Sequence, residues 1–203
     1  MAMEIRAHTF QPRDFVGGHL VLDFVNTVTG WDAQPVDWLD GYARLLDWAV
    51  HSGGFPADTV AALRRAADAD PRAAERALTK NRHLRETLWE VLTALTTQQQ
   101  PDTEALQAQW RTAAGRASLR PVDGHLFAVA TVESSGLDAI THTLALAAVR
   151  FLEDAPTRRL RVCDGHPCGW FYLDTSKAGR RRWCDMATCG NAEKTRRHSA
   201  ARR

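Results

Sequence analysis

The sequence predicts a mainly α-helical protein: a multi-helix N-terminal domain with a short β-hairpin, followed by a small C-terminal α+β module. Three observations carry this prediction. Apolar side chains recur at helical spacing through most of the first 155 residues. One Asp-Gly pair separates two extended segments there. All four cysteines lie between residues 163 and 189, where basic residues also accumulate. We therefore expect two domains, residues 1–155 and residues 158–203.

The first three helices are predicted from short apolar stripes and their end signals. Residues 19–28 place their large apolar side chains at helical spacing. Asp37 can cap a second helix, which stops near Gly53 because glycine suits the left-handed residue that ends many helices. An alanine-rich helix follows over residues 57–68.

The longest predicted helix runs from about Pro71 to Thr97, since proline fits the first turn of a helix. Its apolar stripe consists of Leu84, Leu88, Val91, Leu92 and Leu95. Pro101 ends this helix, and another begins at Asp102 or Thr103 and runs through Arg116. Asp123-Gly124 between extended segments predicts a hairpin. Residues 136–153 form the last expected helix of this domain.

The four cysteines form the pattern C-x4-C-x15-C-x4-C, with Cys163, Cys168, Cys184 and Cys189 as its members. Two local cysteine pairs in an intracellular protein are typical of a metal site, not of a disulfide framework. Four thiolates complete the tetrahedron of a structural zinc ion. We therefore expect one structural Zn²⁺. His166 or His198 in place of one thiolate is an alternative, and the x4 spacing disfavours a redox pair.

The surroundings of the cysteines predict a small module that depends on its metal. A short hairpin is expected around Trp170–Leu173, and a basic helix is expected after Asn191, which can cap it. Such a knuckle, hairpin and helix resemble a treble clef. Fewer than ~50 residues rarely bury enough apolar surface unaided. Chelation is therefore expected to unfold this module while the first 150 residues persist.

Charge is distributed unevenly along the chain. Residues 158–203 carry 12 Lys/Arg and 4 Asp/Glu, a net charge of +8, whereas residues 1–157 carry 14 and 20, a net charge of −6. A basic C-terminal region suggests a polyanionic partner. Guanidinium groups contact phosphates and guanine edges, so nucleic acid is the expected partner. The predicted contact residues are Lys177, Arg180, Arg181, Arg182, Trp183, Lys194, Arg196 and Arg197.

The segment from Cys168 to Cys189-Gly190-Asn191, with Asp174-Thr175-Ser176 and Arg180–Trp183 between the cysteine pairs, resembles the CGNR zinc finger of bacteria. The resemblance covers roughly residues 158–200 and implies transcriptional regulation through DNA binding. Two positions depart from the family pattern, since Ala192 replaces the motif's arginine and Ala178 stands where asparagine is expected. The contact of the missing arginine is absent, or is made by Lys194 or Arg196.

The segment Gly18–Thr27 is similar to the ABATE domain, a helical domain that precedes CGNR fingers. This resemblance covers residues ~15–155 and implies a stress-induced regulator whose helical domain binds a small ligand. Asp23, Asn26 and Thr27 place a carboxylate, an amide and a hydroxyl within two turns of helix. Arg82 and Arg85 of the longest helix are expected to meet them or an acidic ligand. The alternative is that all these residues serve folding.

The leading interpretation is therefore a zinc-containing transcriptional regulator that binds DNA, with a small-molecule effector and a homodimer as further expectations. The alternatives are an RNA-binding module, a protein-binding zinc module and, least favoured, an enzyme. No nucleophile elbow, phosphate loop or metalloprotease helix is found, so no enzyme is expected. The sequence has no apolar run of the ~18 residues that a membrane helix needs. We expect a cytoplasmic protein without a membrane partner.

Overall fold

The computed structural model describes residues 3–31, 33–122, 124–154 and 157–200. Contacts within the chain group it into two compact units. We call Gly41–Ala155 the helical unit, and Met1–Asp40 together with Pro156–Arg203 the finger unit. The structure confirms the expected fold class, mainly α with a small zinc module of mixed α and β structure.

The two units do not coincide with the expected ranges, residues 1–155 and 158–203, because residues 1–40 group with the C-terminal segment. The expected ranges stay a proposal about separable segments of sequence. Part of the expected link between them, residues 155–156, lies outside the described residues.

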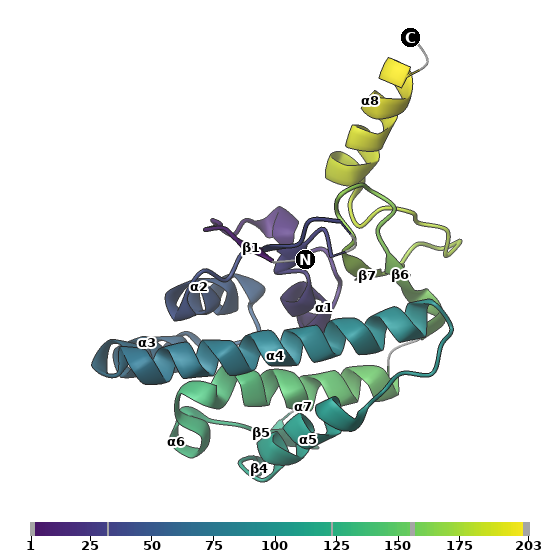
Figure 1. Cartoon of the computed structure of the whole chain (residues 1–203). Helices are drawn as coiled ribbons and strands as arrows, with labels where there is room; N and C mark the ends of the chain where they lie inside the picture. The colour runs from purple at the N-terminus through teal and green to yellow at the C-terminus, as the bar shows by residue number, and fades with distance from the viewer. Residues whose placement is uncertain (1–2, 32, 123, 155–156, 201–203) are drawn as a thin grey trace. The chain divides into compact units, whose positions relative to one another are not determined.

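The helical unit is built from α-helices and one β-hairpin (Figure 1). Its elements are α2 (Tyr42–Ser52), α3 (Ala57–Ala69), α4 (Pro71–Thr96), α5 (Glu104–Ala114), β4 (Ser118–Val122), β5 (His125–Val129), α6 (Val132–Ser135), η2 (Gly136–Asp138) and α7 (Ala139–Asp154). Pro71 occupies the first turn of α4, and Asp70 caps it by accepting from the backbone N–H of Ala73 at 2.9 Å. In α4 the predicted apolar stripe is buried from Leu84 to Leu92. Figure 1 shows α7 running alongside α4, and α7 contributes buried Ile140 and Leu144.

The predicted hairpin is confirmed: β4 and β5 pair antiparallel from Ser118 opposite Val129 to Val122 opposite His125. Of the expected Asp-Gly turn, Asp123 lies outside the described residues and Gly124 has φ +80°. Gly53 ends α2 with φ +66°, as predicted. None of the described helices is both long and apolar enough to cross a membrane.

The start predicted for the second helix is wrong. Asp37 is a strand residue: it is paired with Val28 and Ile5, and its carboxylate accepts from the backbone N–H of Leu39 at 2.9 Å. Because these pairings keep the backbone extended, α2 begins only at Tyr42, after Gly41.

The finger unit contains short elements from both ends of the chain. They are β1 (Glu4–Ile5), η1 (Pro12–Asp14), α1 (Leu20–Val25), β2 (Val28–Thr29), β3 (Val36–Asp37), η3 (Thr157–Arg159), β6 (Leu160–Val162), β7 (Phe171–Leu173), η4 (Met186–Gly190) and α8 (Asn191–Ala200). The first three strands form a sheet of order β1-β3-β2, with β1 parallel and β2 antiparallel to β3. Strands β6 and β7 form a separate antiparallel pair that contains the hairpin residues predicted from the sequence.

Hydrogen bonds tie the N-terminal segment to the hairpin of the finger. The side-chain amide of Asn26 donates to the Phe171 carbonyl at 2.8 Å and accepts from the Phe171 N–H at 2.9 Å. The Leu173 N–H donates to the Gly17 carbonyl at 2.9 Å, and the Gly30 N–H donates to the Cys168 carbonyl at 3.0 Å. Residues 1–40 and the finger therefore share one fold.

Candidate metal centre and nucleic-acid interface

The four cysteine sulfurs meet in one place, although they come from three segments of the finger unit. Cys163 and Cys168 lie in the loop between β6 and β7, Cys184 lies just before the π-helical turn that leads into α8, and Cys189 lies in that turn. The four Sγ atoms all lie within 4.8 Å of one another. Cys184 Sγ is 3.7 Å from both Cys168 Sγ and Cys189 Sγ. None of the four cysteines forms a disulfide.

These distances fit a tetrahedral zinc ion. With Zn–S bonds of ~2.3 Å, the edges of a ZnS4 tetrahedron are about 3.8 Å. The two 3.7 Å separations match such edges. His166 and His198 are exposed and lie outside the four-sulfur group, so all-thiolate ligation is favoured over a histidine ligand. The four-cysteine group and the finger family indicate one structural zinc ion, and Cys163, Cys168, Cys184 and Cys189 are the residues that could hold it.

The first cysteine loop closes tightly around the centre. The Gly165 N–H and the Cys184 N–H both donate to Cys163 Sγ, at 3.4 and 3.3 Å. A Cβ atom on Gly165 would lie 3.0 Å from the Cβ and 3.2 Å from the Sγ of Cys189. A side chain at this position would therefore require Cys189 to shift by a few tenths of an ångström, so glycine fits this close approach best.

The second cysteine loop is a turn capped by Asp185. Its carboxylate accepts from the Thr188 N–H at 2.8 Å and from the Thr188 hydroxyl at 2.9 Å. The turn Met186–Gly190 then continues directly into α8. The prediction that Asn191 caps the basic helix is therefore wrong, because the helical backbone begins earlier. Asn191 is the first residue of α8, and its amide donates to the Ala187 carbonyl at 3.2 Å.

The electrostatics of the thiols favour a bound cation. The pKa of the Cys163 thiol is lowered, because the thiol of Cys168 and then those of Cys184 and Cys189 donate to it. The pKa of Cys168 is raised, chiefly by its hydrogen bond with Cys163. Four sulfurs this close cannot all ionise without a compensating charge, and Zn²⁺ supplies that charge.

A buried aspartate shapes the loop between the cysteine pairs. Asp174 is 1% exposed, and its carboxylate accepts from the N–H groups of Ser176 and Arg181, both at 2.9 Å. The Ser176 side chain, followed by the backbone N–H groups of Arg181 and Ser176, holds the pKa of Asp174 below its usual value, although burial raises it. We did not identify Asp174 as a positioning residue from the sequence. Its Asp-Thr-Ser context is the signal that was available, since aspartate often bonds the backbone two residues ahead.

Arg181 is engaged in the fold of the finger. Its guanidinium Nε donates to the Trp183 carbonyl at 2.7 Å, and its Cζ lies 4.8 Å from the centre of the Tyr172 ring. The Tyr172 hydroxyl in turn donates to the Arg181 carbonyl at 2.6 Å. The predicted role of Arg181 in nucleic-acid binding stays a prediction, and its structural role is evident.

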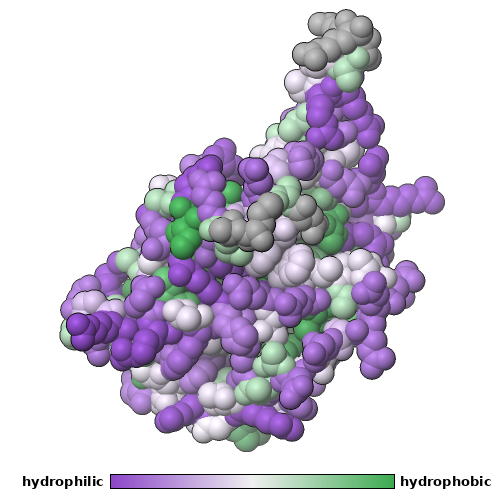
Figure 2. Space-filling model, in the orientation of Figure 1, coloured by the Kyte–Doolittle hydropathy of each residue, from purple (hydrophilic) through white to green (hydrophobic). Residues whose placement is uncertain are grey.

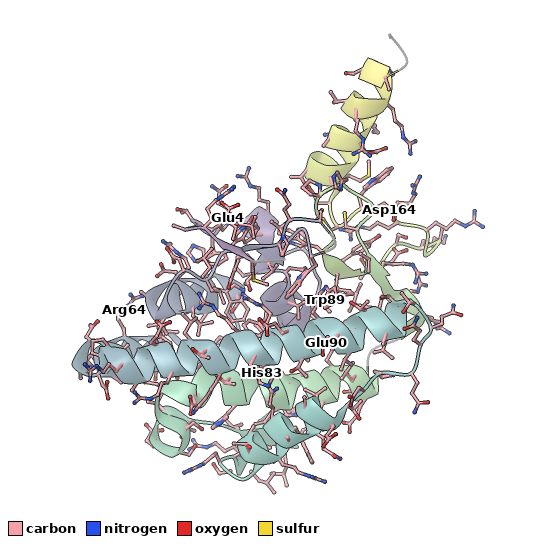
Figure 3. All side chains as sticks on the ribbon, in the orientation of Figure 1. Glu4, Arg64, His83, Trp89, Glu90 and Asp164 are labelled. Atoms are coloured by element: carbon pink, nitrogen blue, oxygen red, sulfur yellow. The ribbon has the colours of Figure 1, made fainter. Side chains whose placement is uncertain are left out.

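Three further arginines are paired with acids at the surface. Arg182 Nε donates to Asp164 at 2.8 Å, and Asp164 lies in the β6–β7 loop labelled in Figure 3. Arg196 and Arg197 both donate to Glu193 on α8. Exposed ion pairs contribute little, ~0–1 kcal/mol. A phosphate can therefore compete for these arginines.

Lys177, Arg180 and Lys194 form a third group, which we call the unpaired cations. Each is exposed, and none has a hydrogen-bond or ion-pair partner in the part of the chain that the structure describes. Helix α8, which carries Lys194, has no buried residue, and its visible face is mainly hydrophilic (Figure 2). Trp183 is half-buried beside them, with the Arg182 Cζ 5.4 Å from its ring centre.

The residues predicted to bind a small ligand fall in both units. Asn26 is bonded to Phe171, and the Thr27 hydroxyl donates to the Phe24 carbonyl at 2.7 Å. Asp23 accepts from the Gly17 N–H at 2.8 Å. Burial raises the pKa of Asp23 to about 6, although this hydrogen bond lowers it. In the helical unit, Arg85 is fully buried on α4, and Arg82 is half-buried. Their ligand role stays a prediction, and the bonds of Asn26 and Thr27 have a sufficient explanation in folding.

The four-thiolate centre, set between a hairpin and a helix, defines a zinc-finger protein. A profile of the CGNR zinc finger matches residues 159–203. A second profile, ABATE, described as "Putative stress-induced transcription regulator", matches residues 18–155. Since it covers more than half of the chain, the protein belongs to this ABATE family. No curated protein matches the chain with significant similarity.

Proposed function

We propose that this protein is a transcriptional regulator that binds DNA through the basic surface of its zinc finger. The observation that carries the proposal is the set of unpaired cations, Lys177, Arg180 and Lys194, in the finger unit that also contains the four-cysteine group. Unpaired exposed cations bind phosphates without first losing an internal partner. Arg182, Arg196 and Arg197, each paired with an acidic side chain, are further cations of the finger unit.

The test is binding of the full-length zinc-loaded protein to a pool of random-sequence duplex DNA at several salt concentrations. The triple variant Lys177→Gln, Arg180→Gln and Lys194→Gln removes only side chains that make no internal bond. Each phosphate contact contributes about −0.9 to the slope of log K against log salt. The slope is therefore expected to become less steep by about 2 to 3, with weaker binding.

A matched control removes the same charge from the helical unit. Arg65, Arg72 and Arg76 are exposed residues of α3 and α4 that have no ion pair among the described residues, and their triple glutamine variant is expected to keep the wild-type slope. Equal slopes for both triple variants contradict the proposal.

Single-stranded RNA is the second candidate partner. The supporting observation is Trp183, whose indole nitrogen is buried without a hydrogen-bond partner and whose ring is flanked by Arg182. Indole rings stack on unpaired bases with ~1–3 kcal/mol per base. Tighter binding to single-stranded RNA than to duplex DNA at equal salt, lost in Trp183→Leu, favours this candidate over DNA.

The proposal includes two properties drawn from the family and the sequence. A small effector is proposed for the N-terminal domain, with the half-buried Asp23, whose pKa burial raises to about 6, as the remaining candidate of the α1 set. A homodimer is proposed because a single finger with one basic helix reads few base pairs. Sedimentation analysis with and without DNA tests the dimer: a monomer in both states contradicts it. A regulatory, non-enzymatic role completes the proposal.

A further inference from the structure

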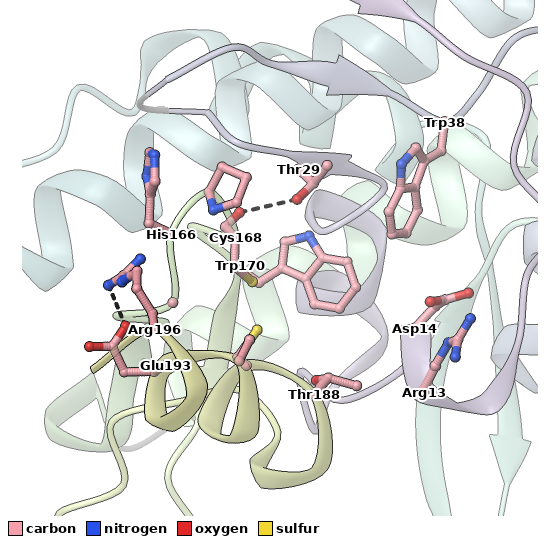
Figure 4. Close-up of a pocket in the computed structure, with 14 residues that line it drawn as sticks. Arg13, Asp14, Thr29, Trp38, His166, Cys168, Trp170, Thr188, Glu193 and Arg196 are labelled. Carbon is pink, nitrogen blue, oxygen red and sulfur yellow. Dashed lines mark hydrogen bonds and ion pairs between the residues drawn. The ribbon is translucent and has the colours of Figure 1, made fainter. Parts of the chain in front are cut away.

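The finger unit contains a cavity between its N-terminal segment and the base of α8 (Figure 4). Its volume is about 580 Å³. Trp38 and Arg13 border it from the N-terminal side, and Cys168, Trp170 and Ala192 from the finger. Cavities that bind small molecules typically measure ~300–1,000 Å³ and have apolar walls with a few polar groups. This cavity has that size and that character.

Two indole rings form the most rigid part of the wall. Trp38 and Trp170 meet edge to face, with ring centres 5.4 Å apart and planes at 82°. Trp38 is also stacked on His8, with ring centres 3.8 Å apart. Fixed aromatic surfaces of this kind favour a flat ring as their ligand.

Both carboxylates of the wall, Asp14 and Glu193, have partners. The Asp14 carboxylate accepts from His8 Nε2 at 2.9 Å and from the Gln11 N–H at 2.8 Å, and Glu193 is paired with Arg196 and Arg197. Arg13 is exposed and has no hydrogen-bond or ion-pair partner within the described ranges. A guanidinium without a carboxylate partner is a ready site for an anion.

One polar atom of the wall also has no partner among the described residues. Trp170 is 8% exposed, and no acceptor within the described ranges takes a hydrogen bond from its buried indole N–H. Figure 4 shows this nitrogen on the side of the ring that faces Thr29, which borders the same cavity. Buried donors are almost always paired in proteins. An acceptor atom of a ligand that enters beside Trp170 would receive a hydrogen bond from this N–H.

We propose that this cavity binds a small planar aromatic molecule that carries one carboxylate. The ring packs against Trp38 and Trp170, and the carboxylate pairs with Arg13. Figure 4 places Arg13 at the end of the cavity opposite His166 and Arg196. This orientation keeps the anion away from the zinc-bound thiolates of Cys168 and Cys189, which would repel it.

The site has a consequence for the finger, although it does not depend on the nucleic-acid proposal. Its walls come from residues 13–38 on one side and from the zinc loops and the first turn of α8 on the other. A ligand in the cavity touches the metal module directly. Its binding therefore stabilises the finger unit by mass action.

The experiment is an NMR titration of the full-length zinc-loaded protein with 2-naphthoate, observing the indole N–H signals. Trp38→Phe assigns the Trp38 signal. We expect saturable shifts of Trp38 and of one further indole signal, that of Trp170, with 2-naphthamide binding at least tenfold more weakly. Arg13→Gln is expected to lower the affinity for naphthoate at least tenfold, since hydrogen bonds to charged groups contribute ~1.5–3 kcal/mol. Arg158→Gln, an exposed residue outside the cavity, is expected to leave it unchanged.

Three outcomes overturn the proposal. The first is no saturable shift of the Trp38 signal at ~10 mM naphthoate, a concentration that detects even millimolar binding. The second is equal affinity for the acid and its amide. The third is equal affinity of Arg13→Gln and Arg158→Gln. The comparison of acid with amide uses the unaltered protein, so it decides the matter even if a variant folds poorly.

Discussion

The bond between Asn26 and Phe171 offers the sharpest prediction about the fold. Asn26 is 1% exposed, and its side chain makes two hydrogen bonds, of 2.8 and 2.9 Å, with the backbone of a strand 145 residues away in sequence. Asn26→Ala removes both bonds and leaves the N–H and carbonyl of Phe171 without partners. A buried group left unpaired costs ~1–3 kcal/mol. With about 1–2 kcal/mol for each of the two groups, in the lower part of this range, the expected loss is about 2–4 kcal/mol.

Hydrogen exchange at the Phe171 amide measures this loss locally. Each 1.4 kcal/mol corresponds to a factor of ten, so exchange is expected to speed up about 30- to 1,000-fold. Asn191→Ala is the matched control, because Asn191 is exposed and makes a single bond to Ala187. It is expected to change exchange by less than a factor of about three. If the Phe171 amide exchanges equally slowly in Asn26→Ala, the structural role of Asn26 is refuted.

Three further predictions concern the metal, one glycine and one carboxylate. Zinc binding contributes ~10–16 kcal/mol in small modules. Chelation is therefore expected to speed hydrogen exchange throughout the finger unit, including α1, while Gly41–Ala155 stays protected. Retained protection in α1 would contradict the shared fold of residues 1–40 and the finger. Gly165→Ala is expected to weaken zinc binding about 10- to 100-fold in a competition assay with a chelating dye, since the added Cβ meets Cys189. The control Gly41→Ala is expected to leave zinc binding unchanged, because no atom lies within 4 Å of the added Cβ. Burial raises the pKa of Asp23 from 3.8 to about 6, so the folded state binds its proton more tightly than the unfolded state does; stability to urea is expected to fall as pH rises from about 4 to 6, and Asp23→Asn should remove this dependence. A wild-type pH profile in that variant shows that another group is responsible.

Local sequence signals predicted the helices of the helical unit well. Helix α4 begins at Pro71 and buries the stripe from Leu84 to Leu92, because apolar periodicity and proline at a first turn are properties of neighbouring residues. The end of α2 at Gly53 and the β4–β5 hairpin were likewise predicted from neighbouring residues. The cysteine spacing was equally informative, since the chemistry of zinc requires four donors.

The errors and omissions arise where distant parts of the chain interact. Asp37 has the sequence signature of a helix cap, yet its pairing with β1 and β2 keeps it in a strand. The hydrogen bonds from Asn26 and Gly17 to β7 join residues that no local pattern relates. Likewise, three consecutive arginines look equivalent in the sequence. Buried Asp174 holds the backbone of Arg181 and turns its side chain toward Tyr172, while Arg180 stays unpaired.

The four-sulfur centre is the feature on which the finger unit depends, and metal content with a thiol count tests it most directly. The protein is purified without added metal, its zinc is quantified by atomic emission, and its cysteines are alkylated before and after chelation. We predict one zinc ion per chain, with Cys163, Cys168, Cys184 and Cys189 protected until the chelator is added. Absence of metal with freely reactive thiols, or a disulfide between two of these cysteines, would contradict the zinc centre.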